Sequence, residues 1–328
     1  MKAKIRKIFI HIGYPKTATT TLQKFLFPKH PEMFDIRDYE NEEKWIYDLL
    51  YLNEISFRKK IDYHKRGLKD KIDSTDRDTI IYSNESILSN SLFFAEKPRP
   101  LVRYLDPSST ARKAHMLFSE LTPEPKIIIV IRNQLDLIKS IYAQMYNYCF
   151  KNYKQTRNFR IYTDNLIRDG ARSFTLSALS YYDVIKEYEK IFGVNNVYIL
   201  VYEELKNSPA HFFQKLESIM GLSRETAYNY INSKNENKKS CMGKYRTDSR
   251  SLLFHLGRLK KRFFGDINIP FADNLGILNN IEIPGKTLNS IKYRDEDFEK
   301  LMKFFDENNR LLAEEYALNL EKYGYFKR

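Results

Sequence analysis

The segment from Ile8 to Leu26 constrains the fold of this chain more than any other. It begins with an apolar, β-prone run that ends in the turn Gly13-Tyr-Pro. Lys16 and a cluster of threonines follow, and apolar residues at helical spacing come next. A strand, a tight loop and a helix N-terminus bind phosphate-like anions well, because free backbone N–H groups and the positive end of the helix dipole converge there. The segment therefore predicts an anion-binding loop.

The side chains of the loop decide which anion-binding class it resembles. Lys16 adds a mobile positive charge, and the threonines offer hydroxyl donors. A Walker A loop has its lysine directly after the second glycine, with a hydroxyl reserved for magnesium. Here Lys16 lies three residues after Gly13, and Ala18 stands where a second small residue is needed. This spacing does not fit a nucleotide triphosphatase.

A second segment, Pro125-Lys-Ile-Ile-Ile-Val-Ile-Arg132, predicts a central parallel strand that is buried on both faces. Asn133 is suited to cap a following helix, and Ser140 lies about two turns into it. Arg132 then sits at the carboxyl end of a strand, where open α/β sheets bind ligands. Taken alone, Arg132 is equally compatible with a surface charge, and Ser140 with a neutral helix position. Their order and distance after the first loop favour a shared site.

The loop resembles the 5′-phosphosulfate loop of sulfotransferases that use 3′-phosphoadenosine 5′-phosphosulfate (PAPS), written G-x-x-K-[ST]-[GA]-[ST]-[ST]-x-L, and meets every position. Arg132 and Ser140 resemble the family's 3′-phosphate motif, although Gln134 replaces a proline that often opens it. The resemblance implies PAPS as co-substrate and no requirement for a metal. The residues that it assigns to PAPS are Gly13, Tyr14, Pro15, Lys16, Thr17, Ala18, Thr19, Thr20, Arg132 and Ser140.

A third segment, Val197 to Pro209, resembles the late strand of the same family. We expect Glu203 and Glu204 to serve the turn and the helix N-terminus, where negative charge is stabilised, and not catalysis. Tyr202 is interpreted as a core aromatic residue, with the adenine site as the alternative.

Alternating strands and helices predict an α/β fold, a parallel sheet flanked by helices. The resemblance implies a P-loop NTPase-like sulfotransferase core with helical and basic loop insertions, in a single domain over residues 1–328. The expected parts are a core of residues 7–27, 79–148 and 175–220, insertions at 40–72 and 151–172, and a C-terminal basic segment and helix at 233–328.

Composition bounds the class of protein. A chain of 328 residues can bury one large core. No run of about twenty apolar residues predicts a membrane span, and the first apolar stretch is too short for a signal peptide. Two cysteines and six histidines form neither a disulfide framework nor a metal-ligand cluster. We therefore expect a cytoplasmic enzyme. The absence of the N-terminal anchor that animal Golgi members carry favours a bacterial one.

The general base is predicted from position. Glu85 follows the short strand Thr79–Ser83, and many carbohydrate sulfotransferases carry a glutamate just after the strand that follows the phosphosulfate loop. An exposed loop carboxylate is the alternative interpretation. His11 is a rival base, but a histidine inside a buried strand is more often a core residue. His64 and His115 are weaker candidates, since no motif surrounds them.

These observations predict transfer of the sulfuryl group of PAPS by in-line displacement, with Lys16 stabilising the leaving phosphate oxygen and Glu85 deprotonating the acceptor. We expect a hydroxyl of an acidic or neutral glycan or glycolipid, as in polysaccharide biosynthesis. A small alcohol or an amine is the alternative acceptor, and a P-loop kinase or a basic binding protein is a more distant alternative. The predicted acceptor channel comprises residues 151–172 and 233–262 with Tyr146, Tyr148 and Tyr153.

The net charge of +13 exceeds what the cofactor needs. It is compatible with an acidic glycan or with peripheral contact with an anionic membrane. Binding to nucleic acid is not expected.

Overall fold

The computed structural model describes residues 6–37, 44–88, 107–148, 150, 154–223 and 291–327, together with short strand segments at 245–246, 250–251, 282–283 and 287–288. The chain divides into two compact units, which are described separately. The first contains Met1–Leu137, Asp164–Asn237 and Asp295–Arg328, and the second contains Ile138–Thr163 and Lys238–Arg294. The single domain over residues 1–328 stays a prediction.

A five-stranded parallel sheet forms the centre of the first unit, in the order β2-β3-β1-β4-β5. The predicted parallel sheet flanked by helices is therefore confirmed. Because β1 lies between β3 and β4, the loop that follows β1 has a strand end on each side. The strands are β1 (Lys7–His11), β2 (Met33–Asp35), β3 (Thr79–Ser83), β4 (Lys126–Ile131) and β5 (Val197–Val201).

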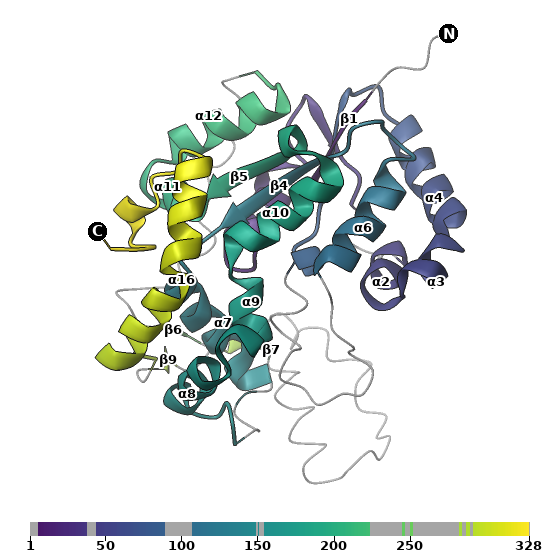
Figure 1. Cartoon of the computed structure of the whole chain (residues 1–328). Coiled ribbons are helices and arrows are strands. Elements are labelled where there is room, and N and C mark those ends of the chain that lie inside the picture. Colours follow the sequence, from purple (N-terminus) through teal and green to yellow (C-terminus); the bar gives the residue numbers. More distant parts are fainter. Residues whose placement is uncertain are drawn as a thin grey trace. The chain divides into compact units, whose positions relative to one another are not determined.

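Helices cover both faces of this sheet (Figure 1). On one face, Ile128 and Val130 belong to an apolar cluster with Phe212 and Phe213 of α12 (Pro209–Met220). Alternate strand residues point to opposite faces, so the neighbouring isoleucines of β4 face the other side, where α10 (Tyr181–Phe192) packs with α6 (Pro107–Phe118) beside it. Apolar residues on both faces explain why β4 is a continuous hydrophobic run.

The segment predicted as a strand, loop and helix over residues 8–27 has this structure. One turn of α-helix, α1 (Thr19–Thr21), continues as the π-helix η1 (Leu22–Leu26). In the part of the expected insertion 40–72 that the structure describes the chain is helical, and the Asn53 side chain caps the second helix by accepting a hydrogen bond from Ser56 N. These helices are α2 (Lys44–Tyr51), α3 (Glu54–Arg58) and α4 (Ile61–Asp73).

The remaining described helices follow β4 in the chain. The expected polar insertion at 151–172 contains a helix, α8, and residues 151–153 lie outside the described part. These helices are α7 (Gln134–Tyr148), α8 (Phe159–Asp169), α9 (Phe174–Ala178), α11 (Tyr202–Asn207) and α16 (Asp295–Glu315), with 3-10 turns η3 (Gly170–Arg172), η4 (Val194–Asn196) and η5 (Glu321–Tyr323). None of the described helices is long and apolar enough to cross a bilayer.

The second unit contains two short antiparallel pairs. Strand β6 (Tyr245–Arg246) pairs with β9 (Thr287–Leu288), and β7 (Arg250–Ser251) pairs with β8 (Glu282–Ile283). Apart from β6 and β7, the predicted basic segment 233–262 lies outside the described residues.

Candidate functional site

The loop of residues 13–18 connects β1 to α1 and is tied to the neighbouring strand β4. Ile12 N donates to Ile128 O at 3.0 Å, and Tyr14 N donates to Val130 O at 3.1 Å. Lys16 and Ala18 have φ values of 62° and 63°, in the left-handed region that residues other than glycine seldom adopt. These two residues turn the chain back so that the helix begins at Thr19. The first N–H groups of a helix have no intrahelical acceptor, which makes this helix start the expected place for an anion.

Gly13 is needed for a close approach of groups inside the loop. A Cβ atom at this position would lie 3.0 Å from His11 Nε2 and 3.3 Å from Thr17 Oγ1. The Thr17 side chain is fully buried, and its hydroxyl donates to Tyr14 O across the loop. Any larger residue at position 13 would therefore push the loop away from the strand end.

Tyr14 and Pro15 face the protein interior. Tyr14 Oη donates to Ala178 O at 2.6 Å, and its ring lies 4.8 Å from that of Tyr181. Burial raises the pKa of the Tyr14 hydroxyl well above its ordinary value, so it stays protonated as a donor. These residues hold the loop in place, and their predicted contact with a cofactor stays a prediction.

On the β3 side of the loop, a carboxylate contacts a threonine hydroxyl. Thr19 Oγ1 donates to Glu85 Oε2. The turn that carries Glu85 is anchored because Asn84 N donates to His11 O at 2.9 Å. Asn84 Oδ1 also accepts from Ser86 N at 2.9 Å. The structure thus brings together Glu85 and the loop, two elements that the sequence separates by about seventy positions.

His11 lies beneath the loop and has no exposed surface. Its Nδ1 pairs with Ser83 Oγ at 2.7 Å, and Gln23 Nε2 donates to the same hydroxyl at 3.0 Å. Its Nε2 is buried without a hydrogen-bond partner among the described residues. Burial, with a smaller contribution from the Arg37 charge, lowers the pKa of His11 to about 3. His11 is therefore neutral near pH 7 and belongs to the core.

The other two candidate histidines pack between helices. His64 is buried, and its Nε2 lies 3.1 Å from Asp48 Oδ2. The His115 ring packs edge-on against Phe192 at 5.1 Å, and burial lowers its pKa. Both side chains have structural partners in the described chain.

On the β4 side of the loop, a guanidinium contacts the loop backbone. Arg132 Nη1 donates to Lys16 O at 2.9 Å, and Arg132 Cζ lies 4.9 Å from the centre of the Tyr202 ring. The Arg132 carbonyl accepts from Tyr181 Oη at 2.6 Å. Tyr202 is half-buried and packs against the apolar cluster of the core.

The residues after Arg132 form a polar turn. The predicted cap of α7 is confirmed, since Asn133 Oδ1 accepts from Leu135 N at 3.1 Å. Asn133 N donates to Glu203 Oε1 at 3.0 Å, and burial raises the pKa of Glu203. Glu203 and Glu204 both lie in the first turn of α11, as predicted. Sequence reasoning did not find the bond between Asn133 and Glu203, since no local pattern connects them.

Ser140 lies on α7 in the second unit, so its predicted role beside Arg132 stays a prediction. That unit has an aromatic cluster in which Tyr142 contacts Phe159 at 5.0 Å and Tyr162 at 5.4 Å. Tyr146 lies 5.8 Å from Tyr142. The Tyr148 side chain and the whole of Tyr153 lie outside the described residues, so the acceptor channel also stays a prediction.

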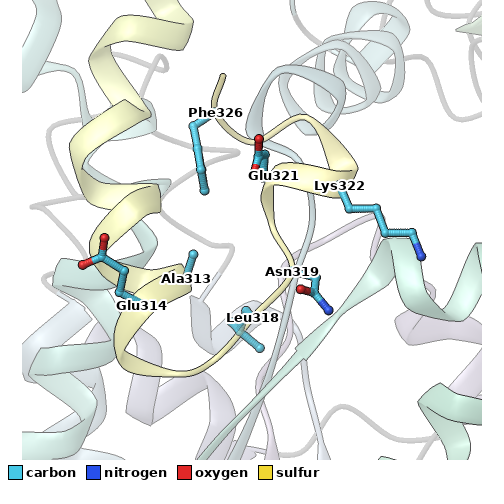
Figure 2. A pocket seen from close by; sticks show the side chains of 7 residues that line it. All are labelled: Ala313, Glu314, Leu318, Asn319, Glu321, Lys322 and Phe326. Carbon is cyan, nitrogen blue, oxygen red and sulfur yellow. The ribbon is translucent and has the colours of Figure 1, made fainter. Parts of the chain in front are cut away.

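The described part of the chain contains no group of three or more His, Cys, Asp or Glu side chains that could hold a metal ion. A surface hollow of the C-terminal segment has a mixed polar and apolar lining, and none of its lining residues belongs to the loop. Figure 2 shows these residues: Ala313, Glu314, Leu318, Asn319, Glu321, Lys322 and Phe326.

A family profile described as sulfotransferase domain matches residues 6–255, which include the loop, Glu85 and Arg132. This chain belongs to the sulfotransferase domain family. The predicted family is confirmed, and with it the enzyme class, a sulfotransferase. A comparison with curated protein sequences finds no match.

Similar solved structures include several sulfotransferases. One from Alicyclobacillus acidocaldarius is 16% identical over 68% of this chain and 83% of its own, with a TM-score of 0.44. Mouse sulfotransferase SULT7A1 complexed with PAP is 16% identical over 71% of this chain and 68% of its own, with a TM-score of 0.36. Likeness at this level does not extend to what those proteins bind.

Proposed function

We propose that this sulfotransferase binds PAPS at the loop of residues 13–18 and transfers its sulfuryl group to a hydroxyl of a glycan or glycolipid. One observation carries the proposal: the loop has the Glu85 carboxylate on one side and the Arg132 guanidinium on the other. Sulfuryl transfer needs a cation for the nucleotide phosphates and a base for the acceptor. Arg132 can supply the cation and Glu85 the base, each from its own side of the loop.

In this proposal the loop holds the 5′-phosphosulfate. Its N–H groups and the Lys16 ammonium stabilise the charge that develops on the leaving phosphate oxygen. The Arg132 guanidinium, which contacts Lys16 O and offers N–H donors in a planar fork, is the proposed ligand of the 3′-phosphate. Ser140 is the proposed second ligand of that phosphate.

The proposed base is Glu85. The acceptor oxygen attacks sulfur, the bond between sulfur and the phosphate oxygen breaks, and 3′-phosphoadenosine 5′-phosphate (PAP) leaves with the bonding electrons. The acceptor proton goes to the Glu85 carboxylate. His11 is a poor alternative, because it has no exposed surface and its pKa is lowered to about 3.

The proposed acceptor is a neutral or acidic glycan or glycolipid. The net charge of +13 supports an anionic partner, and it equally supports peripheral contact with an anionic membrane surface. With 24 tyrosines and 22 phenylalanines, the chain also has aromatic rings to stack on sugar faces.

The deciding experiment incubates the purified protein with sulfur-labelled PAPS and a panel of glycans, glycolipids, small alcohols and amines. We expect label on a glycan or glycolipid, with activity that falls as salt screens the basic surface. Label on small alcohols or amines alone would contradict the proposed acceptor.

A control with EDTA tests the more distant alternative of a P-loop kinase. We expect sulfuryl transfer to survive EDTA. Magnesium-dependent hydrolysis of ATP, without transfer from PAPS, would contradict the proposed function.

A further inference from the structure

The C-terminal segment, residues 295–327, lies beyond the residues that match the sulfotransferase family, yet it reaches the turn that carries Arg132. Helix α16 packs beside α10 in Figure 1. After this helix the chain turns back through η5, and its last residues contact the turn between β4 and α7. The segment is therefore part of the first unit and borders the candidate site.

The first contact is a buried amide pair. Gln134 Nε2 donates to Asn309 Oδ1 at 2.6 Å, and Asn309 Nδ2 donates back to Gln134 Oε1 at 3.3 Å. The Asn309 side chain has no exposed surface and also donates to Tyr325 O at 2.8 Å. Both amide groups need these partners, because a buried polar group without a hydrogen bond is costly.

Two further contacts hold Asn133 and its partner carboxylate. Asn133 Nδ2 donates to Gly324 O at 2.9 Å. Tyr325 is almost fully buried, and its hydroxyl donates to Glu203 Oε2 at 2.9 Å. The other oxygen of Glu203 accepts from Asn133 N. The two residues that follow Arg132 are thus each held by the C-terminal segment.

We propose that Asn309 and Tyr325 are positioning residues that fix Arg132 for the 3′-phosphate of the nucleotide. This inference rests on the proposed function. Gln134 is the first residue of α7, and a proline there would fix the backbone by its own ring. In this chain the amide of Gln134 instead joins the turn to α16. Hydrogen bonds from the C-terminal segment thus take the place of the proline ring in holding this turn.

The test measures the binding of PAP and of AMP, which lacks the 3′-phosphate, by calorimetry. Asn309→Ala breaks the amide pair, and Tyr325→Phe removes one hydroxyl while keeping the buried ring. We expect the affinity for PAP to fall about fivefold or more in each variant, and that for AMP to stay unchanged.

A matched control separates positioning from stability. Tyr316 Oη donates to Glu189 Oε1 at 2.6 Å, so Tyr316→Phe removes the same kind of bond from the same segment without touching the Arg132 turn. We expect this control to change the thermal midpoint alone. If PAP and AMP weaken equally in Tyr325→Phe, or if neither weakens, the inference is overturned. If Asn309→Ala does not fold, Tyr325→Phe decides.

The wild type and Arg132→Ala separate this inference from the proposed function. A wild type that binds AMP as tightly as PAP overturns both. If the wild type prefers PAP, Arg132→Ala abolishes that preference, and both C-terminal variants retain it, then only the positioning role fails.

Discussion

The two sides of the loop differ in charge and in how they are held. On the β3 side, Glu85 contacts Thr19 from a short turn anchored by a backbone hydrogen bond to His11. On the β4 side, Arg132 contacts Lys16 O from a turn that is connected to α11, α16 and the C-terminal residues. A carboxylate faces one side of the loop and a guanidinium faces the other.

This difference indicates that the two sides have different functions, nucleotide binding on the β4 side and deprotonation of the acceptor on the β3 side. A phosphate prefers the cationic side, and a hydroxyl that must lose its proton prefers the side with a carboxylate. Rigid support is most useful where binding depends on the direction of several hydrogen bonds, as with a guanidinium. We therefore expect variants on the β3 side to change turnover and variants on the β4 side to change nucleotide affinity.

The largest expected effect is on the β3 side. Glu85→Gln keeps the shape of the side chain and removes its basicity, so we expect kcat to fall about a hundred- to ten-thousand-fold. PAP binding by calorimetry should stay within about twofold of the wild type, because the glutamine can still accept from Thr19. Glu120→Gln, which changes a surface carboxylate that pairs with Lys65, is the matched control. Normal transfer by Glu85→Gln, together with loss in His11→Ala, would show that the base is the histidine.

The second effect is expected inside the loop itself. Lys16→Ala should lower kcat about a hundred- to thousand-fold, because it removes a preorganised charge from the leaving oxygen. The cost in stability should be small, although Lys16 adopts a left-handed backbone. Steady-state kinetics with labelled PAPS measures the loss, and Lys65→Ala provides a variant with the same change in net charge. Near wild-type turnover would remove Lys16 from the mechanism.

The parts of the site that the sequence predicts are those with a local pattern. The loop reads from Gly13 to Leu22 without interruption, and Arg132 directly follows a continuous apolar strand. Glu85 follows a short strand in the same way. Parallel strands bring their carboxyl ends to one edge of the sheet, so a strand assignment alone places these residues near one another.

The support behind Arg132 could not be predicted in this way. The pairing of Gln134 with Asn309 joins residues 175 positions apart, and no motif surrounds Asn309 in the sequence. The role of Tyr325 could not be predicted either, since nothing in the sequence distinguishes it from the other tyrosines among the 24. The sequence analysis identified Gln134 as a departure from the family's usual proline, but its partner emerges only when α16 packs on α10.

The third effect tests the β4 side. Arg132→Ala should weaken PAP binding about ten- to a hundredfold, because a hydrogen bond to a charged group is worth about 1.5–3 kcal/mol. AMP should bind nearly as before. Arg112→Ala is a suitable control, since that exposed guanidinium pairs with Glu54 of α3 and not with the C-terminal segment. If calorimetry finds equal losses of affinity for PAP and AMP, Arg132 does not bind the 3′-phosphate.

The smallest expected effect is on stability, and it concerns His11 in the core beneath the loop. Burial lowers the pKa of His11 to about 3, from an ordinary value of 6.5. Above pH 6.5 both the folded and the unfolded state are neutral at this residue. Below it, the unfolded state binds a proton that the folded state rejects, so the free energy of unfolding falls as pH drops towards about 3.

The expected slope from His11 alone is about 1.4 kcal/mol per pH unit, once pH is well below 6.5. Urea unfolding at several pH values between 7 and 5 measures it, in the wild type and in His11→Asn. The asparagine can still bond to Ser83 but cannot titrate, so the variant should show a shallower dependence. Equal slopes in the wild type and in His11→Asn would mean that His11 exchanges protons freely in the folded protein. The histidine would then compete with Glu85 for the acceptor side of the loop.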